Sequence, residues 1–331
     1  MAKPVRTPTR IVINPTASQC EAFAAAELAD YVRKMLGKDL TVTRSRHRKR
    51  GEIQIHARRH TDRPPLPIHP RDDTFTIHVT HDRIVLSGQT ERAALYATYA
   101  FLEELGCRWL APEFTFYKGI GHETVPRLRR WAPSVGRRNL KPTFMYRRRT
   151  LDEARSSTVA NTIQLIDWMA KNRMNVMEFS IDYKNAGRFT WDSVRDRLTP
   201  ELRKRGMLIA VGGHGYQNFL HPNDFLDQHP QWFGQIDGER TRNPNCVFNT
   251  ASRAALRMFT SRVADYLRAH REIDILLLWP PDHTRWSEDP ESIGQGSPSR
   301  RQAIVTKAVR DHLKRQHIAR HAGDNGLFKP C

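Results

Sequence analysis

The chain is 331 residues long, a length that suits two domains, or one domain with a large appendage. Hydrophobic residues make up 39% of it, enough for a packed core, but no stretch approaches the roughly 18 unbroken apolar residues of a membrane helix. The formal net charge of +19 would suit a polyanion-binding surface. Because basic residues are scattered over every segment, we favour solvated basic faces and expect no nucleic-acid partner.

Targeting signals and cysteine spacing narrow the function further. The N-terminal segment MAKPVRTPTR is charged but has no apolar core, so no signal peptide is expected and the cytoplasm is the default compartment. The four cysteines lie far apart and form no C-x-x-C pair, which argues against a zinc ribbon or a redox motif. We therefore expect neither a metal nor a cofactor.

Residues 1–111 have the pattern of a small α/β domain, in which two helices cover a set of strands. Apolar residues at helical spacing predict helices over 18–36 and 91–105, ended by Gly37 and Gly106. The strands are predicted at 9–14, 40–43, 52–57, 74–80 and 83–88, of which the last two form a hairpin. Residues 112–141 are rich in Pro, Gly and Arg and are interpreted as a linker.

From residue 142 to 292 the pattern changes to an alternation of strands and helices. Apolar strands are predicted at 144–146, 175–181, 207–213 and 273–279, with helices at 158–173, 191–205 and 250–269. Fully apolar strands separated by helices indicate a parallel sheet that is buried on both faces. The sequence therefore predicts an α/β chain whose second domain is a partial (β/α) TIM-type barrel of about four units. A closed barrel needs eight units, so we expect a C-terminal truncation.

Residues 293–331 are predicted to be a basic tail with one helix near 300–316. The apolar stripe expected on this helix is narrow: Ile304, Ala308, Val309 and Leu313. Such a helix would cover one element of the open sheet and leave the rest uncovered. Self-association through the uncovered sheet is therefore expected.

Several segments resemble known glycoside hydrolases. PTFMYRRRTLDEAR at 142–155, WMAKNRMNVMEF at 168–179 and ELRKRGMLIAVGGHG at 201–215 resemble the first barrel strands of family 20 hexosaminidases. A second set resembles family 163 endo-β-N-acetylglucosaminidases, whose group carries an α-glucuronidase-type or hexosaminidase-type N-terminal domain. This set comprises residues 91–113, GGHGYQNFL at 212–220, HPQWFGQIDGER at 229–240 and LLLWPPDHTRW at 276–286. The resemblance implies a glycosidase that acts on glycans containing N-acetylglucosamine, or on related glycans.

The sequence departs from the second group in one respect. That group has clustered cysteines after the fourth barrel strand, whereas Trp286 is followed here by SEDPES. Together with the missing half of the barrel, this departure predicts impaired hydrolysis. An inactive carbohydrate-binding remnant is the alternative function, and a basic polyanion-binding protein is a less favoured one.

Substrate-binding candidates end the first three barrel strands, because parallel barrels place their chemistry at the carboxyl ends of strands. The Arg147 guanidinium suits paired sugar hydroxyls or a carboxylate, and the resemblance implies sugar binding; a solvated base is the alternative. Glu178 would need a partner inside the barrel, either the substrate or a neighbouring arginine. His214 follows Gly212 and Gly213, which would let the backbone approach a ligand closely. Its imidazole could hydrogen-bond a sugar hydroxyl, or be purely structural.

Two acids after the fourth strand are the catalytic candidates. Asp282 follows prolines that turn the chain out of the sheet, and the resemblance places it where family 20 has an acidic pair. Glu288 is the second candidate. Hydrolysis takes two carboxyls, or one carboxyl with the substrate's N-acetyl group as nucleophile, and the sequence leaves this choice open. The aromatic residues that could contact a sugar are Tyr216, Trp286, Trp232 and Trp279, with core packing the alternative for Trp279.

Overall fold

A computed structural model describes residues 4–58, 73–112, 122–150, 158–181, 189–281, 283–322 and 328–330. The chain divides into two compact units. The first comprises Met1–Arg149, Ser157–Val176 and Asp196–Met207, and the second comprises Thr150–Ser156, Met177–Arg195 and Leu208–Cys331.

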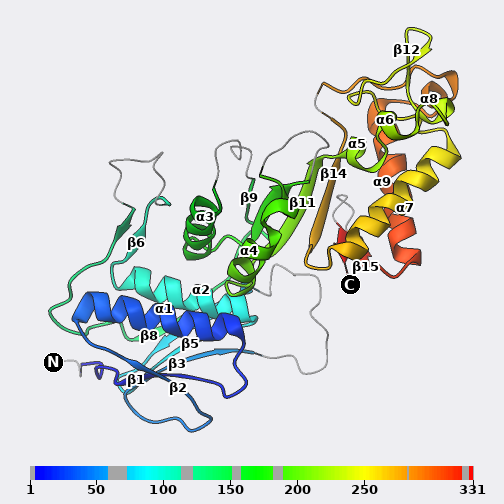
Figure 1. Ribbon diagram of the computed structural model, residues 1–331. Helices are drawn as coiled ribbons and strands as arrows, with labels where there is room; N and C mark the ends of the chain where they lie inside the picture. The colour runs from blue at the N-terminus through cyan, green and yellow to red at the C-terminus, as the bar shows by residue number, and fades with distance from the viewer. Residues whose placement is uncertain are drawn as a thin grey trace. The chain divides into compact units, whose positions relative to one another are not determined.

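The elements of the N-terminal part (Figure 1) are β1 (Arg10–Ile13), α1 (Gln19–Leu36), β2 (Thr41–Arg44), β3 (Glu52–Ala57), β4 (Phe75–Val79), β5 (Arg83–Gly88), α2 (Glu91–Glu104), β6 (Arg108–Trp109), β7 (Glu123–Thr124) and β8 (Gly136–Leu140). Those that follow are β9 (Arg148–Thr150), α3 (Val159–Lys171), β10 (Val176–Ser180), α4 (Trp191–Arg203), β11 (Leu208–His214), α5 (Tyr216–Phe219), α6 (Pro222–Phe225), a 3-10 turn (Pro230–Trp232), β12 (Gln235–Ile236), β13 (Glu239–Arg240), α7 (Arg253–Ala269), β14 (Ile275–Trp279), α8 (Pro290–Gly294), α9 (Pro298–Arg315), β15 (Ala319–Ala322) and β16 (Phe328–Pro330).

The first unit is built on a mixed sheet with strand order β2-β1-β3-β5-β4-β8. Strands β2, β1, β3 and β5 run parallel, and β4 is antiparallel to both β5 and β8. Helices α1 and α2 lie side by side over one face of this sheet (Figure 1). The core between the layers contains fully buried side chains from both, including Ile11, Ile53, Leu28 and Leu95.

The ends of the first two helices follow from local capping. Ser18 and Glu21 form a reciprocal capping box at the start of α1, and Gly37 ends this helix with a left-handed φ of 67°. Thr90 caps α2 by accepting from the Ala93 amide at 3.1 Å. The two predicted helices and the hairpin of β4 and β5 are confirmed.

The edge of the first sheet was not predicted. Strand β8 pairs with β4 over Phe75↔Leu140 to Val79↔Gly136, so part of the segment interpreted as linker completes the sheet. Its sequence, GRRNL, has no apolar alternation, because an edge strand that is largely open to water does not need one.

The second sheet has the order β15-β16-β14-β11-β10-β9. Its middle strands lie in chain order, as in a (β/α) barrel, and β11 and β14 are parallel. The strand predicted at 144–146 is wrong: β9 begins at Arg148, and Phe144 is 71% exposed. The reason is local, because the Arg147 guanidinium donates a hydrogen bond to the Phe144 carbonyl.

The tail contains more structure than its composition indicated. Strands β15 and β16 form an antiparallel pair, and β16 pairs antiparallel with β14 at Leu276↔Phe328. Helix α9 buries a stripe that differs from the one expected, formed by residues four apart: Arg301, Val305, Val309 and Leu313.

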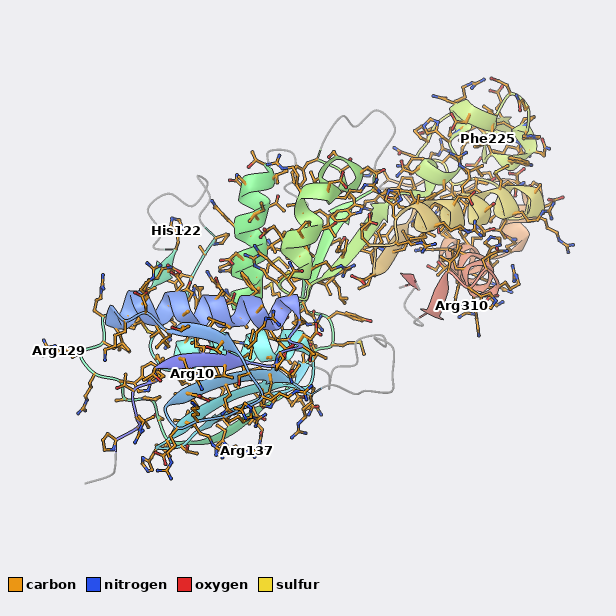
Figure 2. All side chains as sticks on the ribbon, turned by 60° about the horizontal axis from the view of Figure 1, so that its bottom comes forward. Arg10, His122, Arg129, Arg137, Phe225 and Arg310 are labelled. Atoms are coloured by element: carbon orange, nitrogen blue, oxygen red, sulfur yellow. The ribbon has the colours of Figure 1, made fainter. Side chains whose placement is uncertain are left out.

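The predicted fold class is confirmed: the chain is α/β, with a small N-terminal domain and parallel-sheet units. The described residues form no closed barrel. Basic side chains occur on both units, with Arg10, Arg129 and Arg137 at separate places on the first and Arg310 on the second (Figure 2).

Candidate functional site

The carboxyl end of β11 is shaped by two glycines. Gly212 has a φ of 141°, and a Cβ at this position would lie 1.8 Å from the Leu277 carbonyl oxygen of β14. Only glycine permits this close approach of the two backbones. The register then places His214 opposite Trp279, so a histidine and a tryptophan end two neighbouring parallel strands.

The His214 ring is held by the first residue after β14. Its Nδ1 lies 2.7 Å from the Pro280 carbonyl oxygen, which can only accept, so Nδ1 carries the proton in the neutral ring and Nε2 is the acceptor. The Trp279 indole meets the imidazole edge-on, with ring centroids 5.4 Å apart. Both residues are half-buried. An acceptor nitrogen beside an aromatic ring suits a sugar, which has hydroxyl donors and an apolar C–H face.

Glu178 lies on β10, the strand next to β11, and is only 3% exposed. Its neighbour Phe179 packs against Trp191 of α4, with ring centroids 4.7 Å apart. Because side chains alternate along a strand, Glu178 lies on the face turned away from α4, which a barrel would enclose. At the end of β10, the Ile181 amide donates to the Gly212 carbonyl at 3.2 Å. A buried carboxylate is thus on the strand that adjoins the His214 strand.

Tyr216 was expected to contact a sugar with its ring, but the structure places it in a different environment. Its ring is buried against Phe248 and Phe259, with centroids 6.1 and 5.2 Å away. Burial raises the pKa of the Tyr216 phenol well above its ordinary value. These contacts favour core packing. Trp232 is similar, since it is buried and stacks on His229 at 3.9 Å.

Trp286 and Glu288 lie in the loop between β14 and α8. The Arg301 guanidinium lies over the Trp286 ring, 5.4 Å from its centroid. Glu288 is exposed, accepts from the Asp237 amide at 2.7 Å and pairs with Arg285 at 3.3 Å. Glu288 therefore ties this loop to the turn between β12 and β13. Asp282, the first catalytic candidate, lies outside the described residues.

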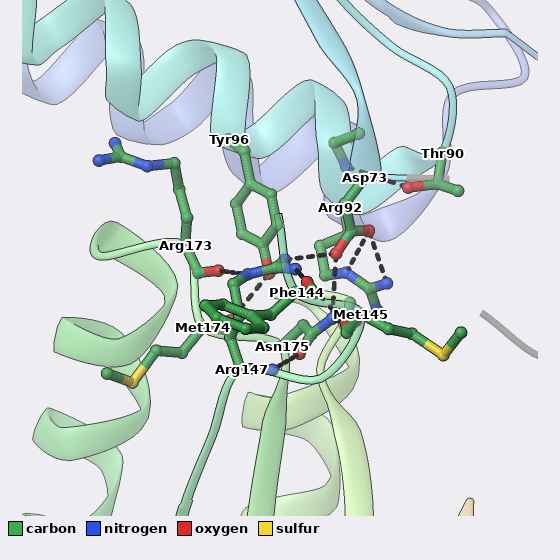
Figure 3. A network of polar contacts seen from close by, with 12 residues as sticks. Asp73, Thr90, Arg92, Tyr96, Phe144, Met145, Arg147, Arg173, Met174 and Asn175 are labelled. Atoms are coloured by element: carbon green, nitrogen blue, oxygen red, sulfur yellow. Dashed lines mark hydrogen bonds and ion pairs between the residues drawn. The ribbon is translucent and has the colours of Figure 1, made fainter. Parts of the chain in front are cut away.

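Arg147 belongs to the first unit, where its guanidinium is engaged by protein acceptors (Figure 3). Nε donates to the Arg173 carbonyl at 2.6 Å, Nη1 donates to the Phe144 carbonyl at 2.7 Å, and Nη2 pairs with Asp73. A sugar could reach this fork only by displacing those acceptors. The geometry favours a structural role, which is one of the two alternatives that the sequence left open.

Asp73 is the centre of this network and was not singled out by the sequence. It is 1% exposed and accepts from Arg92 Nε at 3.0 Å, from Arg92 Nη2 at 2.7 Å and from Asn175 Nδ2 at 3.0 Å, in addition to Arg147. Arg92 also donates to the Gly206 carbonyl at 2.6 Å. Since Asp73 and Asn175 are 102 residues apart in the chain, no local pattern could have connected them.

Among the described residues, no three His, Cys, Asp or Glu side chains are grouped so that they could hold a metal ion. Within the same residues, every helix is too short or too polar to cross a lipid bilayer.

Comparison with known proteins finds similarity to domains of glycoside hydrolases. Residues 2–101 match the N-terminus of glycosyl hydrolase family 67. No curated protein matches the chain. Among solved structures, the chain is similar to the chitobiase of Flavobacterium johnsoniae, with 14% identity and a TM-score of 0.57 over 95% of this chain and 48% of the chitobiase.

Two β-N-acetylhexosaminidases are similar to a comparable degree. For the Bacteroides fragilis enzyme the identity is 14% and the TM-score 0.53, over 95% of this chain and 61% of that one. For the family 20 enzyme of Streptomyces coelicolor the values are 13% and 0.52, over 95% and 62%. The chain thus spans between 48% and 62% of the length of these three proteins. At this identity the likeness is one of fold, and the fold of this chain is related to that of glycoside hydrolases.

Proposed function

We propose that the second unit binds glycans that contain N-acetylglucosamine, or related glycans, at the carboxyl ends of β10, β11 and β14. The observation that carries the proposal is the pairing of His214 with Trp279 at the ends of two parallel strands. The buried Glu178 on the adjoining strand adds a carboxylate to the same sheet. The substrate class is supported by the resemblance of residues 212–220 and 276–286 to family 163, and by the fold shared with a chitobiase.

In this proposal each group has one task. Trp279 offers an aromatic surface to the C–H face of a sugar ring, and Nε2 of His214 accepts from a hydroxyl. Glu178 accepts hydroxyl donors from the inner face of the sheet. Asp282, three residues after Trp279, supplies the carboxyl that hydrolysis would require.

Binding is tested by titration calorimetry with a chitotriose. We expect Trp279→Ala to weaken binding by about tenfold or more, equivalent to about 1.4 kcal/mol, because the sugar loses its aromatic contact. Phe144→Ala removes an exposed aromatic residue of the first unit and should leave the affinity unchanged. Trp279→Phe keeps a ring at the site and should retain most of the affinity. Equal affinities for wild type and Trp279→Ala, with both proteins folded by circular dichroism, would contradict the proposal.

Turnover is expected to be weak or absent, even where binding is measurable. Acid, base and sugar-positioning groups in barrels come from several strands, and the described residues form an open sheet. The assay is hydrolysis of an aryl N-acetylglucosaminide and of an N-glycan by the whole chain, with Asp282→Asn as the control. Binding without turnover would identify a carbohydrate-binding protein. Robust turnover that Asp282→Asn abolishes would show instead that the open sheet suffices for catalysis.

A further inference from the structure

The buried stripe of α9 begins with a charged residue. Val305, Val309 and Leu313 follow Arg301 at intervals of four and are fully buried, and Arg301 itself is 7% exposed. In an amphipathic helix an apolar residue is expected at this position. The second unit therefore carries a guanidinium at a position typical of its core.

The Arg301 guanidinium has few hydrogen-bond partners among the described residues. Nη1 of Arg301 donates to the Ser287 carbonyl at 2.7 Å, and the Trp286 ring lies against the charge. Nε is buried and has no hydrogen-bond partner among the described residues. Within those residues no carboxylate lies within 4.0 Å of Arg301. Burial lowers the pKa of the Arg301 guanidinium below its ordinary value, and no neighbouring acid offsets the effect.

The buried carboxylate of Asp289 lies in the same loop, but it forms an ion pair with a different arginine. Asp289 pairs with Arg240 and also accepts from the Ser287 hydroxyl. The group formed by Arg240, Asp289 and Arg301 thus contains two positive charges and one negative charge. An uncompensated charge away from water is costly, so a second anion would stabilise this group.

The start of α9 adds to the positive potential. Ser297 caps the helix, Pro298 is its first residue, and the first turn contains Arg300 but no acidic side chain. Helix N-termini carry a partial positive charge and usually have acidic residues nearby, so this one is unusually favourable for an anion.

We propose that Arg301 and Trp286 form a subsite for the anionic group of a glycan, either a carboxylate or a sulfate ester. The free Nε–Nη2 edge of the guanidinium would hold two oxygens of that group side by side, while Trp286 would contact the sugar ring that carries it. Ser287 fixes the guanidinium from its other side. This inference rests on the proposed function only in taking a glycan as the ligand.

The test measures thermal unfolding of the full chain with increasing concentrations of four ligands. These are a uronate-containing oligosaccharide, a sulfated oligosaccharide, a neutral oligosaccharide and inorganic sulfate. For wild type we expect the melting temperature to rise with at least one charged oligosaccharide and with inorganic sulfate. The carboxylate and sulfate arms show which oxyanion the subsite takes.

Variants separate the subsite from general charge effects. Arg301→Met should remove the anion-dependent rise, and Arg301→Lys should weaken it, since a lysine lacks the paired donors. Arg300→Met removes the adjacent exposed arginine and should preserve the rise. Without ligand, Arg301→Met should melt at or above the wild-type temperature, because it replaces a buried unpaired charge by an apolar chain.

Two results would overturn the inference. One is an equal anion-dependent rise in wild type and in Arg301→Met. The other is a ligand-free Arg301→Met protein that melts well below wild type, which would make Arg301 a structural residue. Because inorganic sulfate needs no sugar contact, its arm stays informative if the Trp279 test fails, so the two proposals can fail separately.

Discussion

Gly212→Ala should destabilise the second unit by about 4 kcal/mol or more, enough to leave much of the protein unfolded or insoluble. The added Cβ would lie 1.8 Å from the Leu277 carbonyl oxygen and 2.7 Å from its carbonyl carbon, both of which are backbone atoms of the central strand β14. A flexible side chain could rotate away from a methyl group, but a paired strand cannot. The measurement is soluble yield, followed by guanidinium unfolding of any soluble fraction.

Gly213→Ala is a closely matched control. Gly213 also has a positive φ, 94°, but its Cβ would meet nothing closer than a Trp279 ring carbon at 3.9 Å. Alanine therefore meets only backbone strain at this position, which costs about 1–3 kcal/mol. A Gly212→Ala protein as stable as Gly213→Ala would show that β11 and β14 do not approach as closely as described.

Asp73→Ala should lower the free energy of unfolding by about 3–5 kcal/mol, the usual result of removing one partner of a buried ion pair. Arg92 is buried, and among the described residues its guanidinium would keep only the Gly206 carbonyl as an acceptor without Asp73. Arg147 and Asn175 lose the same carboxylate. Guanidinium unfolding followed by tryptophan fluorescence measures the change.

Two comparisons make the Asp73 result specific. Asp30→Ala breaks the half-exposed pairs of Asp30 with Arg33 and Lys34 and should cost about 0–1 kcal/mol. The double variant Asp73→Ala with Arg92→Met removes both charges and should regain part of the lost stability. If Asp73→Ala costs no more than Asp30→Ala, the network does not hold the first unit together.

The sequence predicts this fold best where the determinants are local. Ser18 and Glu21 are three residues apart, and Thr90 caps its helix within the same turn, so short-range patterns were sufficient for α1 and α2. The two glycines before His214 were interpreted as allowing a close approach to a ligand, whereas the close approach that the structure shows is that of Gly212 to the Leu277 backbone of β14.

Predictions failed where a side-chain contact or a distant partner overrode the apolar pattern. The apolar triplet from Phe144 to Tyr146 has the composition of a strand, but Arg147 binds its carbonyls. Strand β8 is specified by its partner β4, since its own residues are mostly polar. In α9 the spacing of Val305, Val309 and Leu313 was readable, and extending it back by four residues would have singled out Arg301.

Strand β16 has a consequence for how the second sheet can grow. A strand edge offers a single row of amide and carbonyl groups, and at Leu276 this row of β14 is occupied by the antiparallel β16. Barrel growth would add a parallel strand on the same side. The two neighbours compete for one set of donors and acceptors, so an incoming strand has to displace the β15–β16 hairpin. Strand β16 thus lies at the edge of β14 where the next parallel strand of a barrel would pair.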